Sequence, residues 1–138
     1  MNDQMPRFIV DELKSNLEQK KVNISTSRLL ICGYTFKENC NDYRNTKVFD
    51  IAKIASKKFK YVEIFDPLLN HEELANETSL KFIENVSETK KYNAVILAVP
   101  HKELVSKGFK FYNSILTKKG IFFDLKSSFA KQHSDFRL

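Results

Sequence analysis

An apolar run, Arg28-Leu29-Leu30-Ile31-Cys32, stops abruptly at Gly33. Apolar runs without polar alternation predict strands that are covered on both faces, as in parallel sheets. Three further runs have the same character: Tyr61-Val62-Glu63-Ile64-Phe65, Ala94-Val95-Ile96-Leu97-Ala98-Val99 and Gly120-Ile121-Phe122-Phe123-Asp124. We therefore expect four strands of one parallel sheet at these positions.

Helical patterns alternate with the apolar runs. One face of the segment 48–55 carries Val48, Ile51, Ala52 and Ala55, and Asn45 or Thr46 is its expected cap. Shorter helices are expected near 71–76, 102–106 and 111–116, and a brief strand near 80–83. Strands that alternate with helices predict right-handed βαβ units. The expected fold is α/β: a Rossmann-like, three-layer open parallel sheet with helices on both faces, preceded by one N-terminal helix.

That N-terminal helix is expected to have Pro6 in its first turn and to end near Lys20-Lys21. Ile9, Val10, Leu13 and Leu17 recur at helical spacing along it. We expect this apolar stripe to pack on a domain outside this chain, and within this chain to pair two copies or to fray.

The composition favours a globular protein with an anionic ligand over a membrane protein or a nucleic-acid-binding protein. The 138 residues are 42% apolar and 29% charged, which suits one globular domain. The formal charge is +6, from 23 Lys plus Arg against 17 Asp plus Glu, and it favours an anionic ligand. Because the lysines are scattered, nucleic acid is not an expected partner. The chain has no apolar run of about 20 residues, no signal-peptide pattern and only two cysteines, so we expect a cytoplasmic protein without a membrane partner.

A long polar segment, residues 33–47, follows the first predicted strand and carries the cations Lys37 and Arg44. Loops of this length inside a compact domain are usually functional. The Gly-rich dinucleotide motif is missing, so a phosphate here would be held by side-chain cations and by backbone amides at the next helix start. The alternative is a solvated connector whose charges pair with one another.

The sequence of this segment closely resembles a family signature. Residues 33–48, GYTFKENCNDYRNTKV, are similar to the G-L-T-F-K-E-N-C-P-D-x-R-N-T-K-V motif of the UDP-glucose/GDP-mannose dehydrogenase family. Further matching segments are Asn2-Asp3-Gln4-Met5-Pro6, Phe65-Asp66-Pro67, residues 94–103 (AVILAVPHKE) and Phe123-Asp124-Leu125-Lys126-Ser127. More narrowly, the chain resembles the branch that oxidises UDP-N-acetylhexosamines for bacterial capsule and O-antigen sugars.

The resemblance implies that the chain is one part of a longer enzyme. Residues 1–22 would be the end of a central dimerisation helix, and residues 23–138 a C-terminal UDP-sugar-binding Rossmann-like domain. The parent would be an NAD-dependent UDP-sugar 6-dehydrogenase, a homodimer or higher oligomer that oxidises a C6 alcohol to a carboxylate for surface polysaccharide synthesis. The NAD-binding N-terminal domain and the catalytic cysteine would lie outside this chain, which is therefore expected to be inactive alone. The alternative is a stand-alone nucleotide-binding or regulatory module.

The resemblance also implies roles for individual residues, none of them catalytic or metal-binding. Phe36 and Lys37 would meet the nucleotide-sugar, and Lys126 is similar to a basic residue that approaches the substrate of the neighbouring subunit. Arg44 would reach the NAD of the missing domain, and Asp42 would orient Arg44 or the loop. Cys32 is expected in the core and Cys40 in loop packing.

For the other candidate residues, a structural role is favoured over a functional one. His101 with Glu103 is a weak metal pair, and a helix start after Pro100 explains His101 better. Asp66 suits either a ribose contact or a turn before Pro67, and we favour the turn. The aromatic residues Phe109, Phe111 and Tyr112 are expected in the core.

Overall fold

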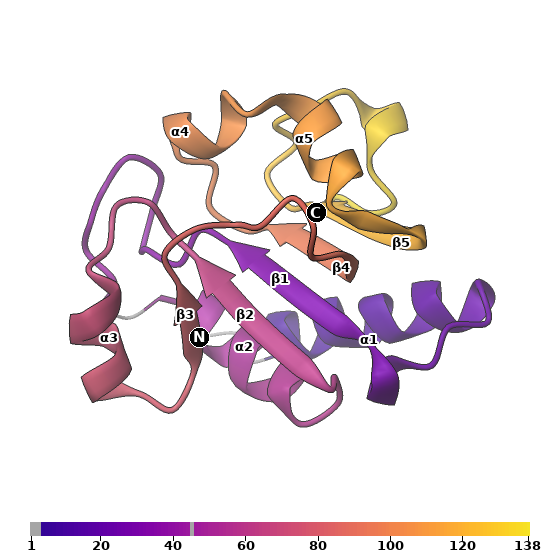
Figure 1. The fold of residues 1–138 in the computed structure, drawn as a ribbon, viewed down its shortest axis with the longest axis horizontal. Helices are drawn as coiled ribbons and strands as arrows, with labels where there is room; N and C mark the ends of the chain where they lie inside the picture. The colour runs from indigo at the N-terminus through magenta and orange to yellow at the C-terminus, as the bar shows by residue number, and fades with distance from the viewer. Residues whose placement is uncertain (1–3, 45) are drawn as a thin grey trace.

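A computed structural model describes residues 4–44 and 46–138 (Figure 1). It contains a five-stranded sheet in the order β3-β2-β1-β4-β5, with every pairing parallel. The strands are β1 (Arg28–Cys32), β2 (Tyr61–Phe65), β3 (Lys81–Ile83), β4 (Tyr92–Leu97) and β5 (Leu116–Asp124). The predicted fold class and the positions of the central strands are confirmed. The sequence expectations for Asn2, Asp3 and Asn45 fall outside the described residues.

Helices cover both faces of the sheet, as predicted. They are α1 (Gln4–Gln19), α2 (Val48–Ser56), α3 (His71–Glu77), α4 (Lys102–Val105) and α5 (Gly108–Ser114), with short 3₁₀ turns at Ile24–Thr26 and Lys131–His133. Figure 1 shows α1 and α2 on one face and α4 and α5 on the other. Each face has its own apolar core, and the alternating residues of β1 supply both, with Leu29 and Ile31 in one and Leu30 and Cys32 in the other.

The apolar stripe of α1 packs inside this chain, so the expectation that it packs elsewhere is wrong. Ile9, Val10, Leu13 and Leu17 are at most 1% exposed and belong to the same core as α2. An apolar stripe on a helix is stabilised when it is buried against another apolar surface, whether that surface belongs to the same chain or to another. Here the faces of α2 and β5 provide that surface, which makes α1 an integral layer of the fold.

Two boundaries near the last strand also differ from expectation. The predicted helix 111–116 is displaced to Gly108–Ser114, and β5 starts at Leu116 rather than Gly120. The cause is a pairing that the local pattern does not show. Tyr92 donates its backbone N–H to the Ile115 carbonyl, and Tyr92 pairs with Leu116 before a register shift in β4. This contact extends β4 and β5 toward their amino ends.

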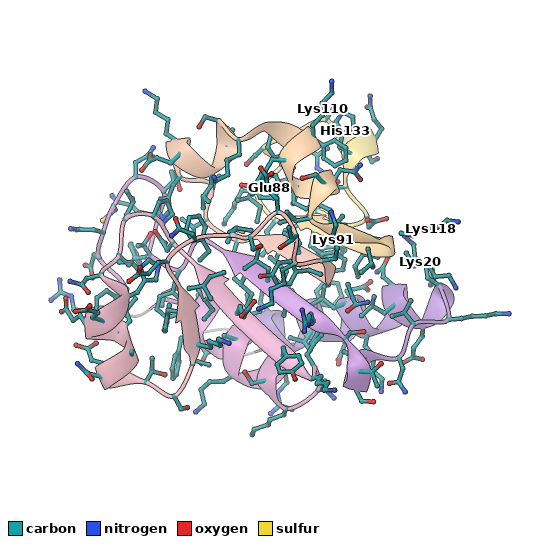
Figure 2. The ribbon with its side chains drawn as sticks, viewed as in Figure 1. Lys20, Glu88, Lys91, Lys110, Lys118 and His133 are labelled. Atoms are coloured by element: carbon teal, nitrogen blue, oxygen red, sulfur yellow. The ribbon has the colours of Figure 1, made fainter. Side chains whose placement is uncertain are left out.

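Charged side chains are spread over the surface. Figure 2 shows Lys20, Lys91, Lys110 and Lys118, which come from different elements of the fold. Some of them have partners within the chain: Lys20 Nζ lies 3.3 Å from the Gly120 carbonyl, and Lys91 donates to the Ser114 carbonyl. Among the described residues, no helix has the length and apolar character needed to cross a membrane.

Candidate functional site

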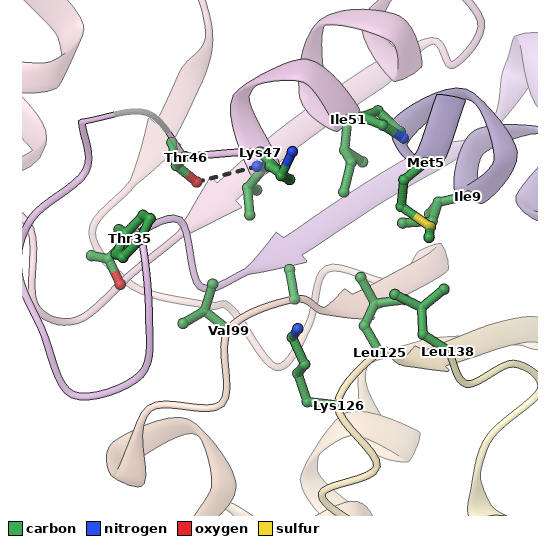
Figure 3. Close-up of a pocket in the computed structure, with 14 residues that line it drawn as sticks. Met5, Ile9, Thr35, Thr46, Lys47, Ile51, Val99, Leu125, Lys126 and Leu138 are labelled. Atoms are coloured by element: carbon green, nitrogen blue, oxygen red, sulfur yellow. Dashed lines mark hydrogen bonds between the residues drawn. The ribbon is translucent and has the colours of Figure 1, made fainter. Parts of the chain in front are cut away.

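A cavity of about 460 Å³ lies at the carboxyl edge of the sheet (Figure 3). The residues that follow β1, β4 and β5 line it, together with the start of α2 and the first turns of α1. β1 and β4 are neighbours at which the order of the strands reverses. In open α/β sheets, ligands bind in the crevice outside the strand ends at such a switch point. The cavity is therefore the leading candidate for a ligand site.

Gly33 lets the chain turn directly out of β1 toward this cavity. Its φ is +91°, a conformation that L residues with a Cβ rarely adopt. A Cβ built at this position would lie 2.4 Å from the Val99 carbonyl oxygen and 2.7 Å from the Val99 backbone nitrogen. Only glycine fits both the turn and the close approach of the segment that follows β4.

The 33–47 loop is held at its beginning by Asp66, which follows β2. Asp66 Oδ2 accepts hydrogen bonds from the backbone N–H groups of Tyr34, at 2.7 Å, and Thr35, at 3.3 Å. Its Oδ1 accepts from the N–H of Leu68, at 2.9 Å, which confirms the predicted turn. The carboxylate is fully buried, so a ribose cannot reach it. The loop closes on itself where the N–H of Phe36 donates to the Asp42 carbonyl at 2.7 Å.

His101 holds the middle of the loop from the opposite side. It is fully buried directly before α4, and its Nδ1 accepts the backbone N–H of Asn39 at 2.9 Å. Its Nε2 lies 2.9 Å from Asp66 Oδ2 and 3.1 Å from Thr35 Oγ1. Both ring nitrogens thus have protein partners, and Glu103 is exposed. No group of three His, Cys, Asp or Glu side chains suited to a metal ion occurs within the described part of the chain.

The charge state of Asp66 follows from these contacts. Burial alone raises the pKa of a carboxyl group, but the hydrogen bonds from His101, Tyr34 and Leu68 outweigh that effect and lower the pKa of Asp66. Asp66 is therefore a carboxylate that accepts hydrogen bonds from several segments. It ties the loop after β1 to the turn after β2.

Two of the five residues predicted for the site line the cavity. Phe36 is 61% exposed and contributes to the cavity wall from the loop after β1. Lys126 comes from the segment after β5, and Figure 3 shows its side chain extending between Val99 and Leu125. A turn positions Lys126, because the buried Asp124 carboxylate accepts the N–H groups of Ser128 and Phe129, both at 2.9 Å.

The other three predicted residues do not line the cavity. Lys37 is exposed on the loop beside Phe36. Arg44 and Asp42 form a two-point ion pair, with Nε 3.0 Å from Oδ1 and Nη2 3.1 Å from Oδ2. The hydrogen bonds from Arg44 lower the pKa of Asp42. The guanidinium side chain remains 83% exposed, so it is available to a group outside this chain.

The start of α2 contributes residues that the sequence analysis did not assign to the site. Thr46 and Lys47 line the cavity, and the Thr46 hydroxyl accepts the N–H of Val48 at 3.1 Å (Figure 3). The N-cap of α2 is Lys47, which makes no side-chain capping hydrogen bond, so the expected cap at Thr46 is displaced by one residue. Lys47 was part of the recognised motif, but no local pattern shows that a lysine at a helix start faces a cavity.

The two cysteines differ in their surroundings. Cys32 is 1% exposed within β1, and burial raises its pKa to about 12, so the thiol stays protonated. This confirms its place in the core. Cys40 is half-buried in the loop and is a free thiol.

Comparisons with known proteins agree with this geometry. The model of the UDP-glucose/GDP-mannose dehydrogenase family, UDP binding domain, matches residues 30–131. The chain is 34% identical over all of its 138 residues to a UDP-N-acetyl-D-glucosamine 6-dehydrogenase of Salmonella typhi, and 32% identical to one of Pseudomonas aeruginosa. In each case it covers 32% of the relative, so the chain spans about a third of the length of these curated relatives.

A solved structure has the same fold. The UDP-D-ManNAc dehydrogenase from Pyrococcus horikoshii superposes with a TM-score of 0.77 at 20% sequence identity. The match covers 99% of this chain and 31% of that one.

Proposed function

Because the chain belongs to the UDP-glucose/GDP-mannose dehydrogenase family, we propose that its cavity binds the UDP part of a nucleotide-sugar. The observation that carries the proposal is the position of the cavity at the β1–β4 switch point, with most of its lining residues inside the segment 30–131 that the UDP binding domain matches. Two lysines from separate elements, Lys47 and Lys126, line it. No other activity is needed to explain these features.

The lining suits the chemistry of a nucleoside diphosphate. Its two phosphates carry negative charge, and each charge-assisted hydrogen bond from a lysine contributes about 1.5–3 kcal/mol. Backbone N–H groups at the start of α2 add donors with the favourable end of the helix dipole. The remaining wall is apolar, with Ile9, Val99 and Leu125 available to the base and ribose. Phe36 adds an exposed aromatic face.

We further propose that the whole protein is an NAD-dependent 6-dehydrogenase acting on a UDP-N-acetylhexosamine, as the names of its relatives suggest. Bound NAD would supply the hydride acceptor for the oxidation. This chain has only Gly33 after β1 and no Gly-rich turn to cradle a dinucleotide. Its residues therefore fit only a peripheral contact with NAD that another domain holds. Our candidate for this contact is the exposed guanidinium of Arg44, which pairs with Asp42.

The first 22 residues are proposed to contribute to self-association, and residues 23–138 to supply most of the nucleotide-sugar site, to which α1 adds Ile9. Within α1 the apolar stripe is already buried, which leaves Phe8 as a large apolar side chain that is 47% exposed. Phe8 packs on Phe136, with ring centroids 5.8 Å apart. It is the side chain we propose for contact with a second copy.

Calorimetric titration with UDP tests the nucleotide site. We expect binding by the wild-type chain and a loss of about tenfold in affinity for Lys126→Ala and for Lys47→Ala, since each removes a charged donor. Lys37→Ala tests whether a lysine outside the cavity wall also reaches the ligand. Lys118→Ala, on β5 and not among the lining residues, is the matched control and should bind like the wild type.

Two results contradict the proposal. One is the absence of UDP binding by the wild-type chain. The other is an equal loss of affinity for Lys118→Ala and the two cavity lysines, because that pattern indicates attraction to the net charge of +6 rather than a site.

A further inference from the structure

Asp66 and His101 form a fully buried pair of ionisable side chains that the nucleotide site does not contact directly. They are 35 residues apart in the sequence, and the Oδ2–Nε2 distance is 2.9 Å. Buried ionisable groups are costly unless hydrogen bonds satisfy them. Apart from the bond of Asp66 to Leu68, the hydrogen bonds of the pair go to the 33–47 loop, which contributes Phe36 to the cavity wall.

The contacts of His101 define its tautomer. The backbone N–H of Asn39 can only donate, so the Nδ1 that accepts it carries no proton. The proton of the neutral ring is therefore on Nε2, which faces Asp66 Oδ2 and Thr35 Oγ1. The Thr35 hydroxyl donates to the Lys37 carbonyl at 2.9 Å, which leaves its oxygen free to accept. A carboxylate and a neutral Nε2–H imidazole match every partner in this network.

The network fixes the loop on both sides of its exposed tip. Asp66 binds the N–H groups of Tyr34 and Thr35, directly before Phe36. His101 binds Asn39, two residues after Lys37. Asn39 has a φ of +58°, and its side-chain oxygen accepts the N–H of Lys102 at the start of α4, at 2.8 Å. Phe36 and Lys37 thus lie between two anchored points a few residues apart.

We propose that Asp66 and His101 are positioning residues that hold the 33–47 loop in the conformation that binds the nucleotide. The inference rests on the proposed function, since it assumes that the cavity takes UDP. Neither side chain touches the ligand. They act through the backbone groups that they hold, and His101 acts as the Nε2–H tautomer.

Isosteric variants separate the two halves of the network. Asp66→Asn replaces a carboxylate oxygen with an amide group. His101→Gln can place a donor near Asp66 but loses the acceptor for Asn39, whereas His101→Asn keeps an acceptor near Asn39 and loses the donor to Asp66. Glu63→Gln is the matched control, because Glu63 is a buried carboxylate of β2, bonded to Lys90 and Tyr92, that does not contact the loop.

For variants that retain the fold by circular dichroism, we expect UDP affinity to fall about ten- to one-hundred-fold in Asp66→Asn and His101→Gln. His101→Asn should retain part of the affinity that His101→Gln loses. The control should lose stability in urea but keep wild-type affinity, which separates positioning from a general loss of stability. Wild-type affinity in all folded loop-network variants overturns the proposal.

A measurement on the wild-type chain needs no variant and no ligand. Long-range ¹H–¹⁵N correlation spectra should show His101 as the Nε2–H tautomer, and the Asn39 amide should exchange slowly with solvent. A proton on Nδ1, or a rapidly exchanging Asn39 amide, overturns the proposal. If these spectra agree but UDP does not bind, the proposed function fails, and with it the ligand assigned to the loop.

Discussion

At the scale of single residues, the site depends on a few positions where only one side chain fits. Gly33 is one, because the positive φ and the close approach of Val99 act together. Asp66 and His101 are others, because each is fully buried and accepts backbone N–H groups of the loop, from Tyr34 and Thr35 and from Asn39 respectively. The sequence motif contained Gly33 and its neighbours, but the two residues that hold the loop lie in other motifs.

Gly33→Ala is expected to destabilise the chain by roughly 2–4 kcal/mol, through the strained φ and the overlap with Val99. Gly108 provides the control, since its φ is also positive, at +80°, but a Cβ there meets nothing within 4 Å. Gly108→Ala should therefore cost only about 1–2 kcal/mol. Urea denaturation measures both, and equal losses would show that the contact with Val99 contributes nothing.

The buried Glu63 carboxylate is expected to make the folding stability of the chain depend on pH. It is 2% exposed and accepts hydrogen bonds from Lys90 Nζ and Tyr92 Oη, both at 2.7 Å. Burial raises its pKa, but the bonds from Lys90 and Tyr92, with Lys81 nearby, outweigh burial and lower the pKa. A lowered folded-state pKa gives stability that is present above the unfolded value of about 4.3 and is lost as the pH falls through the folded pKa.

The measurement is urea denaturation of the wild type and of Glu63→Gln at neutral and acidic pH. At pH 7 we expect the variant to be less stable by about 1–3 kcal/mol, because a charged acceptor is removed. This difference should shrink as the pH falls below about 4. A difference that stays constant or grows on acidification contradicts the lowered pKa.

At the scale of elements, the periodic patterns identified the strands and helices because burial on one or both faces leaves a local signal. The runs of β1, β2 and β4 and the stripe of α1 are of this kind. The shifted starts of α5 and β5 are not, since they follow from the pairing of Tyr92 with Leu116 across the sheet. The Asp66–His101 contact likewise joins residues that are 35 positions apart, so no local sequence pattern indicates it.

α1 illustrates the difference between finding a helix and finding its partner. Its stripe predicted the helix correctly, but the surface it covers belongs to α2 and β5 of the same chain. Leu13→Ala should therefore cost about 2–5 kcal/mol in urea denaturation, as for other buried leucines. Lys14→Ala, one residue along and with a side chain that is 47% exposed, should change stability by no more than about 0.5 kcal/mol. A Leu13→Ala variant as stable as Lys14→Ala would show that α1 does not pack on the domain.

At the scale of the whole molecule, the fold brings together three strand ends, the start of α2 and α1 to form one cavity. The family signature located the loop and Lys126, and the strand order explains why they meet. The exposure of Lys37 depends on the conformation of the loop, whose backbone Asp66 and His101 bind at Tyr34, Thr35 and Asn39. The chain thus has a candidate nucleotide site, and the buried, protonated Cys32 thiol is not suited to attack an aldehyde.

The chain alone is therefore expected to bind UDP without oxidising a UDP-sugar. Incubation with UDP-N-acetyl-D-glucosamine and NAD should give no increase in NADH absorbance above a protein-free control. The expectation is that binding residues lie in this chain and the catalytic nucleophile in another domain. NADH formation that scales with protein concentration and persists in Cys40→Ser would contradict it.

Titration of the ¹⁵N-labelled chain with UDP, followed through its amide signals, tests whether UDP binds in the cavity at the carboxyl edge of the sheet. Binding in this cavity predicts saturable shifts at Thr35, Phe36, Thr46–Val48, Val99 and Lys126, with the amino-end residues of β1 and β4 unchanged. Shifts that gather elsewhere, or a titration without saturable change at these residues, would contradict it.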